Sequence, residues 1–151
     1  MEFETDAQKQ CFEKIGPLAK EIFGDFAMIS DERPVVVVAV GSAVAHVAIY
    51  PWGDDDTSIC TRAYVVMDVE LTADLMRYLL SENNTMRFGA FGVDRDGDVF
   101  FEHSIVGSTC DREELKSSVM AVISTADKAD DEIVAKWGGR RAADAMGQAG
   151  E

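Results

Sequence analysis

Apolar residues recur every three or four positions between residues 115 and 137, and this periodicity constrains the fold more than any other feature. The stripe comprises Leu115, Val119, Val122, Ala126, Ala129, Ile133 and Trp137. Residues at this spacing lie on one face of a helix. We expect a long helix from Asp111, with Thr109 as its N-cap and Gly138-Gly139 as its end. Residues 140–151 are rich in Ala, Gly and charge, and predict a frayed tail.

Five segments of the chain have the composition of β-strands. They run over Val35–Val40, Ala43–Tyr50, Ile59–Asp68, Arg87–Asp94 and Asp98–Val106. The unbroken valines of the first segment are typical of a strand that is buried on both faces. Gly41-Ser42 and Asp96-Gly97 are two-residue sequences typical of hairpin turns. The third segment alternates, and this places Arg62 and Tyr64 on one face.

Two further helices complete the predicted order. One runs from about Thr5 to Gly24, and Gly16-Pro17 predicts a kink or a division into two short helices. The other follows Thr72, a natural N-cap, and ends near Ser81. The order α-β-β-β-α-β-β-α predicts an α+β fold in which helices cover a five-stranded antiparallel sheet. We expect one domain over residues 1–139.

Composition and charge exclude several classes of partner. The chain has 14 basic and 28 acidic residues, a net charge of −14, so its surface repels nucleic acids and anionic membranes. The first ten residues lack the basic and apolar regions typical of a signal peptide, and we expect the longest uncharged run to form strands and not a membrane span. Cys11, Cys60 and Cys110 are widely spaced and odd in number. We interpret them as reduced thiols of a cytoplasmic protein.

The residues that could carry chemistry do not form a known catalytic pattern. Asp94–Asp98 lacks the spacing of a calcium loop, and Asp54–Asp56 is typical of a solvated turn. Cys110 could pair with His46 or His103, but acidic neighbours oppose its ionisation. We therefore predict no enzyme, no catalytic residue, no cofactor and no metal.

The helix after Thr72 has a wider apolar surface than one sheet requires. Its apolar residues are Leu75, Met76, Tyr78, Leu79 and Leu80. Together they span an arc of about 200° at 100° per residue. We expect this helix to form a dimer or partner interface, and the alternative is a deep groove within one monomer. Trp52 and Trp137 are further candidate contact residues, although each could pack in the core.

Several segments together resemble a known family. They are Val35–Val38 with Gly41-Ser42 and Ala43–Tyr50, then Leu71–Leu80, Arg87–Phe91, Asp96–Asp98 and the strand from Val99. Over Glu4 to Trp137 the chain resembles the type III secretion chaperone-like fold, and within it the YbjN-type proteins. Secretion chaperones of this fold are small acidic dimers that hold an extended client segment in apolar grooves. YbjN-type proteins are named as sensory transduction regulators, and the resemblance implies no catalytic residue.

Two functions remain open from the sequence. The first is a non-enzymatic protein-binding module, a homodimeric chaperone-like adaptor or regulator with a protein or peptide client. The second is a small-molecule sensory domain, in which His46, Arg62, Tyr64 and His103 could orient a ligand in an apolar pocket.

Overall fold

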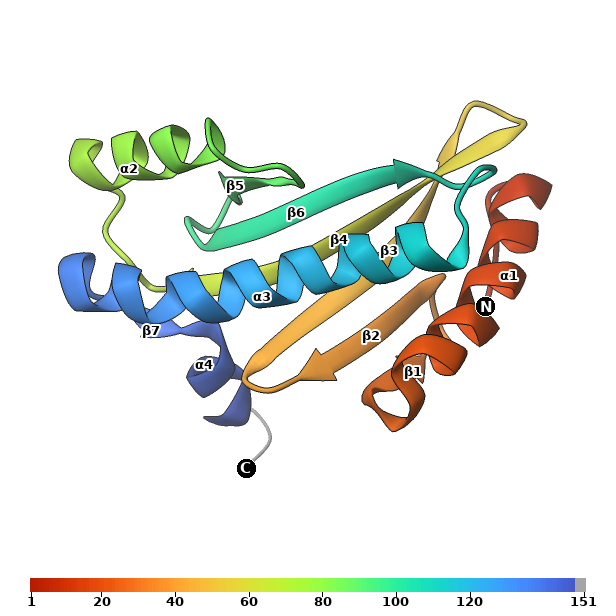
Figure 1. The fold of residues 1–151 in the computed structure, drawn as a ribbon, viewed down its shortest axis with the longest axis horizontal. Coiled ribbons are helices and arrows are strands. Elements are labelled where there is room, and N and C mark those ends of the chain that lie inside the picture. The colour runs from red at the N-terminus through yellow and green to blue at the C-terminus, as the bar shows by residue number, and fades with distance from the viewer. Residues whose placement is uncertain (149–151) are drawn as a thin grey trace.

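In the computed structural model, which describes residues 1–148, helices pack against one antiparallel sheet (Figure 1). The helices are α1 (Asp6–Phe23), η1 (Gly24–Phe26), α2 (Ala73–Asn83), α3 (Arg112–Trp137) and α4 (Ala142–Gln148). The strands are β1 (Ala27–Ile29), β2 (Val35–Val40), β3 (Ala43–Trp52), β4 (Asp56–Met67), β5 (Ala90–Val93), β6 (Val99–Val106) and β7 (Arg140–Arg141). Their order across the sheet is β1-β2-β3-β4-β6-β5, and β7 pairs with β4. No helix among these residues has the length and apolar character needed to cross a membrane.

The predicted α+β class and antiparallel sheet are confirmed, but the predicted strand count is wrong. The sheet has seven strands, and the five predicted from the sequence correspond to β2 to β6. The two additional strands, β1 and β7, contain three and two residues. Strands that short contain no repeat of the two-residue period from which strands are recognised.

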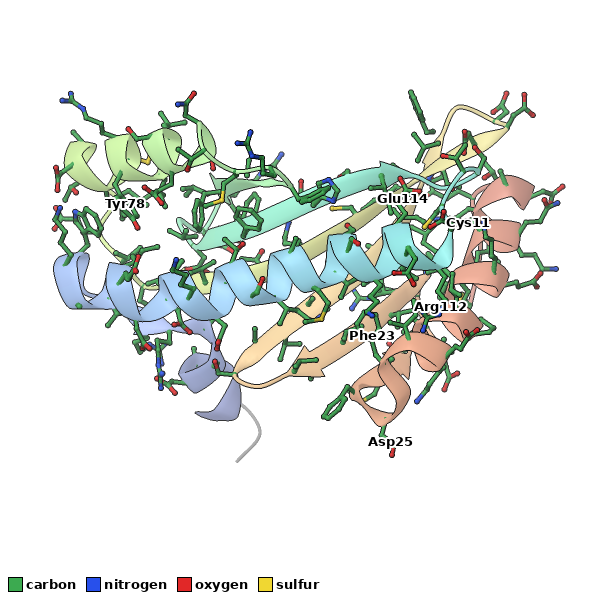
Figure 2. All side chains as sticks on the ribbon, viewed as in Figure 1. Cys11, Phe23, Asp25, Tyr78, Arg112 and Glu114 are labelled. Carbon is green, nitrogen blue, oxygen red and sulfur yellow. The ribbon has the colours of Figure 1, made fainter. Side chains whose placement is uncertain are left out.

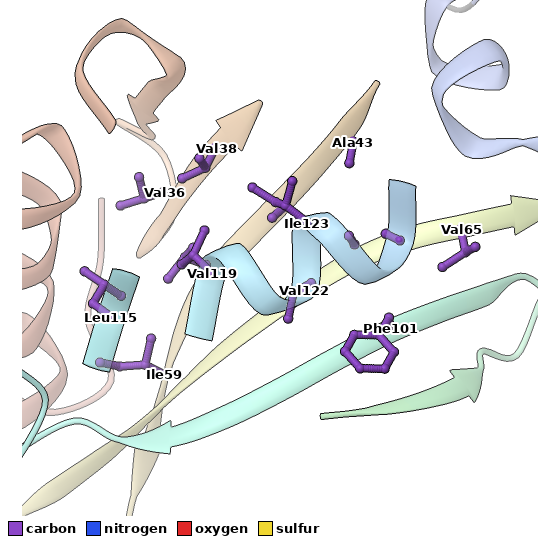
Figure 3. Packing of buried hydrophobic residues seen from close by; sticks show 14 of the residues in the cluster. Val36, Val38, Ala43, Ile59, Val65, Phe101, Leu115, Val119, Val122 and Ile123 are labelled. Carbon is purple, nitrogen blue, oxygen red and sulfur yellow. The ribbon is translucent and has the colours of Figure 1, made fainter. Parts of the chain in front are cut away.

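The core lies between the sheet and the two helices α1 and α3. Figure 3 shows residues of α3, such as Leu115, Val119 and Val122, packing toward buried side chains of the strands. The predicted stripe of α3 is therefore the inner face of this helix, with Trp137 half-buried at its end. Phe101 of β6 is completely buried. Its ring packs against the Phe91 ring in an edge-to-face arrangement, with 5.0 Å between the ring centroids.

Helix α1 is continuous across Gly16-Pro17, so of the two predicted alternatives, a kink or a division, the division into two short helices is wrong. Pro17 is exposed, and so is Glu13, whose carbonyl loses its helical partner because proline lacks an N–H. Water can satisfy that carbonyl, which removes the main cost of the interruption. Gly16 faces inward, where an added Cβ would lie 3.2 Å from Cδ1 of Ile29. The glycine thus allows α1 to approach β1 closely.

The end of the chain differs from the predicted frayed tail. After α3, residues 140–148 form β7 and α4, while residues 149–151 lie outside the described part. The guanidinium of Arg141 pairs with Asp131 of α3 and with Asp144 of α4. Ala142 is buried against the domain. Two arginines therefore fasten this segment to the sheet and to α3, because Arg140 also pairs with Asp68.

The N-cap of α3 also differs from the prediction. Asp111 occupies this position, and its carboxylate accepts a hydrogen bond of 2.7 Å from the main-chain N–H of Glu114. Thr109 lies two residues earlier. Aspartate and threonine are both competent N-caps, so two candidates this close cannot be ranked from residue type. The predicted cap Thr72 of α2 and the predicted stop at Gly138 are confirmed.

Candidate functional site

One face of the sheet lies opposite the core and keeps its side chains partly exposed. We call it the open face. It consists of Val35, Val37, Ala39, Val44, His46, Ala48, Tyr50, Ser58, Cys60, Arg62, Tyr64, Phe100, Glu102, Ser104 and Val106. All of them are partly or fully exposed except Ala48, which is buried at its centre. The prediction that the valine strand is buried on both faces is therefore wrong, since Val36, Val38 and Val40 face the core while Val35 and Val37 belong to the open face.

The register of the strands aligns four of these side chains in one row. Val37 of β2 lies opposite His46 of β3, His46 opposite Arg62 of β4, and Arg62 opposite Glu102 of β6. His46, Arg62 and Glu102 line a depression of about 370 Å³. The row passes from an apolar end on β2 to a charged pair on β4 and β6. A segment lying across the strands would therefore meet both kinds of side chain.

The opposite charges of Arg62 and Glu102 in this row neutralise each other. Nε of Arg62 donates a hydrogen bond of 2.6 Å to the Glu102 carboxylate, and the Arg62 guanidinium lies 3.8 Å from the centre of the Phe100 ring. Burial and the nearby Arg33 lower the pKa of His46, so its imidazole is neutral at pH 7. The centre of the open face thus has no net charge, although the whole chain carries −14.

The four polar residues predicted to orient a small ligand do not converge. His46, Arg62 and Tyr64 belong to the open face, whereas His103 faces α3, where its Nδ1 lies 2.8 Å from Oγ of Ser118. The Tyr64 hydroxyl donates a hydrogen bond of 2.8 Å to Asp94. Opposite faces of one sheet cannot form a common pocket for these groups. This arrangement does not favour the sensory alternative.

The cysteines are free thiols, and none has the environment of a nucleophile. The pKa of Cys110 is raised to about 11, chiefly by burial and next by the charge of the neighbouring Glu114. Burial likewise raises the pKa of Cys60 to about 11, with Glu102 as the second cause. At neutral pH both thiols are protonated, and the thiolate is the reactive form. The Cys110 thiol instead donates a hydrogen bond of 3.5 Å to the carbonyl of Asp111.

The aspartate-rich turns use their carboxylates to hold local structure. Asp94 accepts hydrogen bonds from the main-chain N–H groups of Asp96 and Asp98, each at 3.0 Å. Asp56 accepts hydrogen bonds from Thr57 and Ser108. Within residues 1–148, His, Cys, Asp and Glu side chains form no group of three that could hold a metal ion.

The five residues predicted as an interface divide between two environments. Leu75 and Leu79 are buried, and Tyr78 packs against Trp137 of α3. Figure 2 shows Tyr78 on the side of α2 that faces α3. Met76 and Leu80 are 41% and 70% exposed, and they lie one helical turn apart. The outward apolar ridge of α2 therefore consists of Met76 and Leu80.

The other tryptophan predicted as a contact residue, Trp52, is exposed at the end of β3.

The open face was not among the sites predicted from the sequence. The available signal was the alternation in β4, where Arg62 and Tyr64 interrupt an apolar pattern.

Comparison with protein families places this geometry in context. A family described as "T3SS (YopN, CesT) and YbjN peptide-binding chaperone 1" matches residues 13–145. The chain belongs to this family. The family predicted from the sequence is confirmed, and its description assigns it to peptide-binding chaperones. No curated protein matches the chain in sequence.

Solved structures with the same fold include chaperones in complex with other proteins. The ExsC–ExsE complex contains a chain that is 18% identical, with a TM-score of 0.63 over 84% of this chain and 96% of that chain. The HopA1–SchA chaperone–effector complex gives 8% sequence identity and a TM-score of 0.61, over 82% of this chain and 96% of that chain. The Yersinia pestis type III secretion chaperone SycH was solved in complex with a fragment of YscM2. Its structure gives 14% sequence identity and a TM-score of 0.51, over 80% of this chain and 98% of that chain. At these identities the similarity shows the fold alone.

Proposed function

We propose that the protein is a non-enzymatic chaperone-like adaptor or regulator that binds a protein client on the open face of its sheet. The observation that carries this proposal is the uncovered row from Val37 through His46 and Arg62 to Glu102. Membership of a peptide-binding family supports it. Two of the structural neighbours are chaperones solved with a bound effector or fragment, which supports the same kind of partner here.

The chemistry of the open face indicates what kind of client segment it holds. Its β2 and β3 portion is apolar, with Val35, Val37 and Val44 half-exposed. Contact with an apolar segment would remove this surface from water, at about 25 cal/mol per Å². Arg62 and Glu102 already form an ion pair, so a client need not supply a counter-charge. The client segment therefore has an apolar side that faces β2 and β3.

The protein acts as a homodimer in this proposal, and the outer ridge of α2 forms its interface. Met76 and Leu80 are the exposed apolar residues of this helix. Leu75, Tyr78 and Leu79 serve the same interface indirectly, because they fasten α2 to the domain. An isologous contact would place the ridge of one copy against the same ridge of the other.

The remaining properties of the protein are consistent with an adaptor in the cytoplasm. Its three thiols are free, as in reducing compartments. Its net charge of −14 opposes binding to nucleic acids and anionic lipids. We therefore assign it a protein partner, with no nucleic acid and no membrane.

Affinity capture with matched variants tests this function. The tagged protein is incubated with lysate of cells that naturally express it, and bound proteins are identified by mass spectrometry. We expect one stoichiometric client for the wild type and for Met120→Asp, which changes an exposed residue of α3 away from the open face. Val37→Asp, which charges the apolar end of the row, should lose that client while the circular dichroism spectrum stays unchanged. A client retained by Val37→Asp would refute the open face as its site.

A further inference from the structure

A cavity of about 550 Å³ opens between helices α2 and α3. Helix α2 lies beside the C-terminal half of α3 (Figure 1), where Tyr78 packs against Trp137. The lining includes Tyr78 and Glu82 of α2, Phe91 of β5 and Glu132 of α3. Because Phe91 belongs to the buried core, the cavity lies on the core side of the sheet and is separate from the open face. Its volume is within the range of about 300–1,000 Å³ that is typical of small-molecule sites.

The floor of this cavity is apolar and held in place. Phe91 and Ala129 are 8% and 6% exposed, and the half-buried Met86 joins them in the lining. The side-chain amide of Asn83 fastens Phe91 to α2. Its Nδ2 donates a hydrogen bond of 3.2 Å to the Phe91 carbonyl, and its Oδ1 accepts one of 2.6 Å from the Phe91 N–H. The floor is therefore organised before any ligand binds.

Two carboxylates and a tyrosine hydroxyl line the same cavity. Tyr78 and Glu82 lie one helical turn apart on α2, and the Tyr78 hydroxyl donates a hydrogen bond of 3.2 Å to Glu132 of α3. Burial and the charges of Glu82 and Glu132 raise the pKa of Tyr78 to about 12, so its hydroxyl stays protonated at neutral pH. Its single proton is already donated to Glu132.

The carboxylate of Glu82 lacks a partner. It is half-buried, and within residues 1–148 it forms no hydrogen bond and no ion pair. A charge that is partly removed from water without a partner costs free energy. A cationic group in the cavity would offset that cost.

The cavity as a whole carries negative charge. Of the described residues that line it, Lys128 is the one cation, and it is exposed on α3. Lys128 lies one helical turn before Glu132, so it offsets one of the two carboxylates. The hydroxyl groups of Ser124 and Thr125 are uncharged. The remaining negative charge selects a cation over an anion.

We propose that the cavity between α2 and α3 binds a small organic amine, in which a protonated amino group is attached to an apolar body. The ammonium group would lie between Glu82 and Glu132. It would also be attracted to the face of the Tyr78 ring. The apolar body would cover Phe91 and Met86 and remove them from water.

This site differs from the small-molecule alternative derived from the sequence, because none of the four polar residues named for that alternative lines it. It corresponds instead to the groove within one monomer that the wide apolar surface of α2 also allowed. Tyr78 and Glu82 face this groove, whereas Met76 and Leu80 lie on the outward side of α2. A bound amine and the proposed dimer therefore use opposite sides of the helix.

Isothermal titration calorimetry with matched compounds tests the inference. The probe is 2-phenylethylamine, which is a cation at pH 7. Its controls are 2-phenylethanol, which is neutral, and 3-phenylpropionate, which is an anion. We expect the amine to bind at least about tenfold more tightly than the alcohol, because only the amine forms charged hydrogen bonds with the carboxylates, and 3-phenylpropionate should not bind. Equal affinity of amine and alcohol, or no binding of the amine, would overturn the proposal.

Protein variants locate the bound amine. Glu82→Gln should weaken its binding about tenfold, since it removes the unpaired carboxylate. Glu13→Gln, which changes an exposed carboxylate of α1, is the matched control and should have no effect. Lys128→Gln should strengthen binding about twofold, because a like charge is removed from the rim. Thermal unfolding checks that each variant is folded, and an amine that binds Glu82→Gln like the wild type would refute this site.

Phenylalanine, in which a carboxylate is added to the same amine, tests the role of Lys128. It should bind more weakly than 2-phenylethylamine, because its carboxylate is repelled by Glu82 and Glu132. If phenylalanine binds more tightly and loses this advantage in Lys128→Gln, the ligand is a zwitterionic amino acid and the proposal of a simple amine is wrong.

The inference is independent of the proposed client site. Val37→Asp changes the opposite side of the sheet and should bind 2-phenylethylamine like the wild type. Absence of amine binding would refute the cavity site and leave the adaptor function in place. Loss of the client without loss of amine binding would refute the adaptor function alone.

Discussion

Tyr78 and Trp137 pack ring against ring, with 4.8 Å between their centroids, and join α2 to the last residue of α3. Each ring also contributes a hydrogen bond to the other helix. The Tyr78 hydroxyl donates to Glu132 at 3.2 Å, and Nε1 of Trp137 donates to Asp74 at 3.1 Å. This contact sets the direction in which α2 presents Met76 and Leu80.

Removal of the Tyr78 ring should destabilise the domain. Tyr78→Ala loses the aromatic pair and part of the packing beneath α2, and should lower the free energy of unfolding by about 2 kcal/mol. Tyr78→Phe keeps the ring and should cost less than about 0.5 kcal/mol, since its hydrogen bond is exposed. Urea unfolding measures both values. Equal effects of the two variants would contradict a role for ring packing.

The proposed dimer interface should respond to charge on the α2 ridge. Native mass spectrometry of the wild type should give twice the monomer mass of 16.5 kDa. Met76→Asp should give the monomer, because two buried carboxylates would face each other across an isologous contact. Met120→Asp is the matched control, since Met120 is an exposed methionine of α3 with a similar exposure of 37%. A Met76→Asp protein that keeps the dimer mass would place the interface elsewhere.

His46 should make stability depend on pH. Its folded pKa is lowered by burial and by Arg33, so the unfolded chain takes up the proton at a higher pH than the folded chain. Stability from the neutral imidazole is complete above the unfolded pKa of about 6.5 and is lost as the pH falls toward the folded pKa. We expect His46→Gln to flatten the fall in unfolding free energy between about pH 7 and pH 5.5. An identical pH dependence in wild type and variant would refute this role.

The cysteine thiols should resist alkylation while the protein is folded. A pKa of about 11 for Cys60 and Cys110, against an ordinary value of 9.0, reduces the thiolate fraction about 100-fold at neutral pH. Iodoacetamide should therefore modify both residues at least about 100-fold more slowly in the folded protein than in urea. Peptide mass mapping over time gives the two rates. Rapid modification of folded Cys110 would reopen a chemical role for it.

The parts of the fold that the sequence predicted are those with long local patterns. The stripe from Leu115 to Ile133 extends over five helical turns, and its buried face follows directly from the spacing. The hairpin at Gly41-Ser42 and the cap at Thr72 each depend on a few adjacent residues. These features were predicted because neighbouring residues suffice to determine them.

The parts that were missed depend on distant residues. Valines are alike on both sides of β2, so only the position of α1 and α3 determines that Val37 is half-exposed while Val36 is buried. The burial of residues in α2 also depends on a distant element. Leu79 faces inward and Leu80 outward, and the sequence alone does not distinguish them because the difference depends on where α3 lies. The pairing of Arg141 with Asp131, which orders the segment after α3, also joins residues whose contact has no local signature.

Site-specific photo-crosslinking tests the central claim, that the open face holds a protein client, most directly. Photoreactive benzoylphenylalanine replaces Val44 on the open face in one variant and Met120 on α3 in another. Each variant is irradiated in cells that naturally express the protein, and adducts are identified by mass spectrometry. The account predicts a single dominant protein adduct from position 44 and none from position 120. An adduct from position 120 alone, or the absence of any protein adduct at position 44, would contradict it.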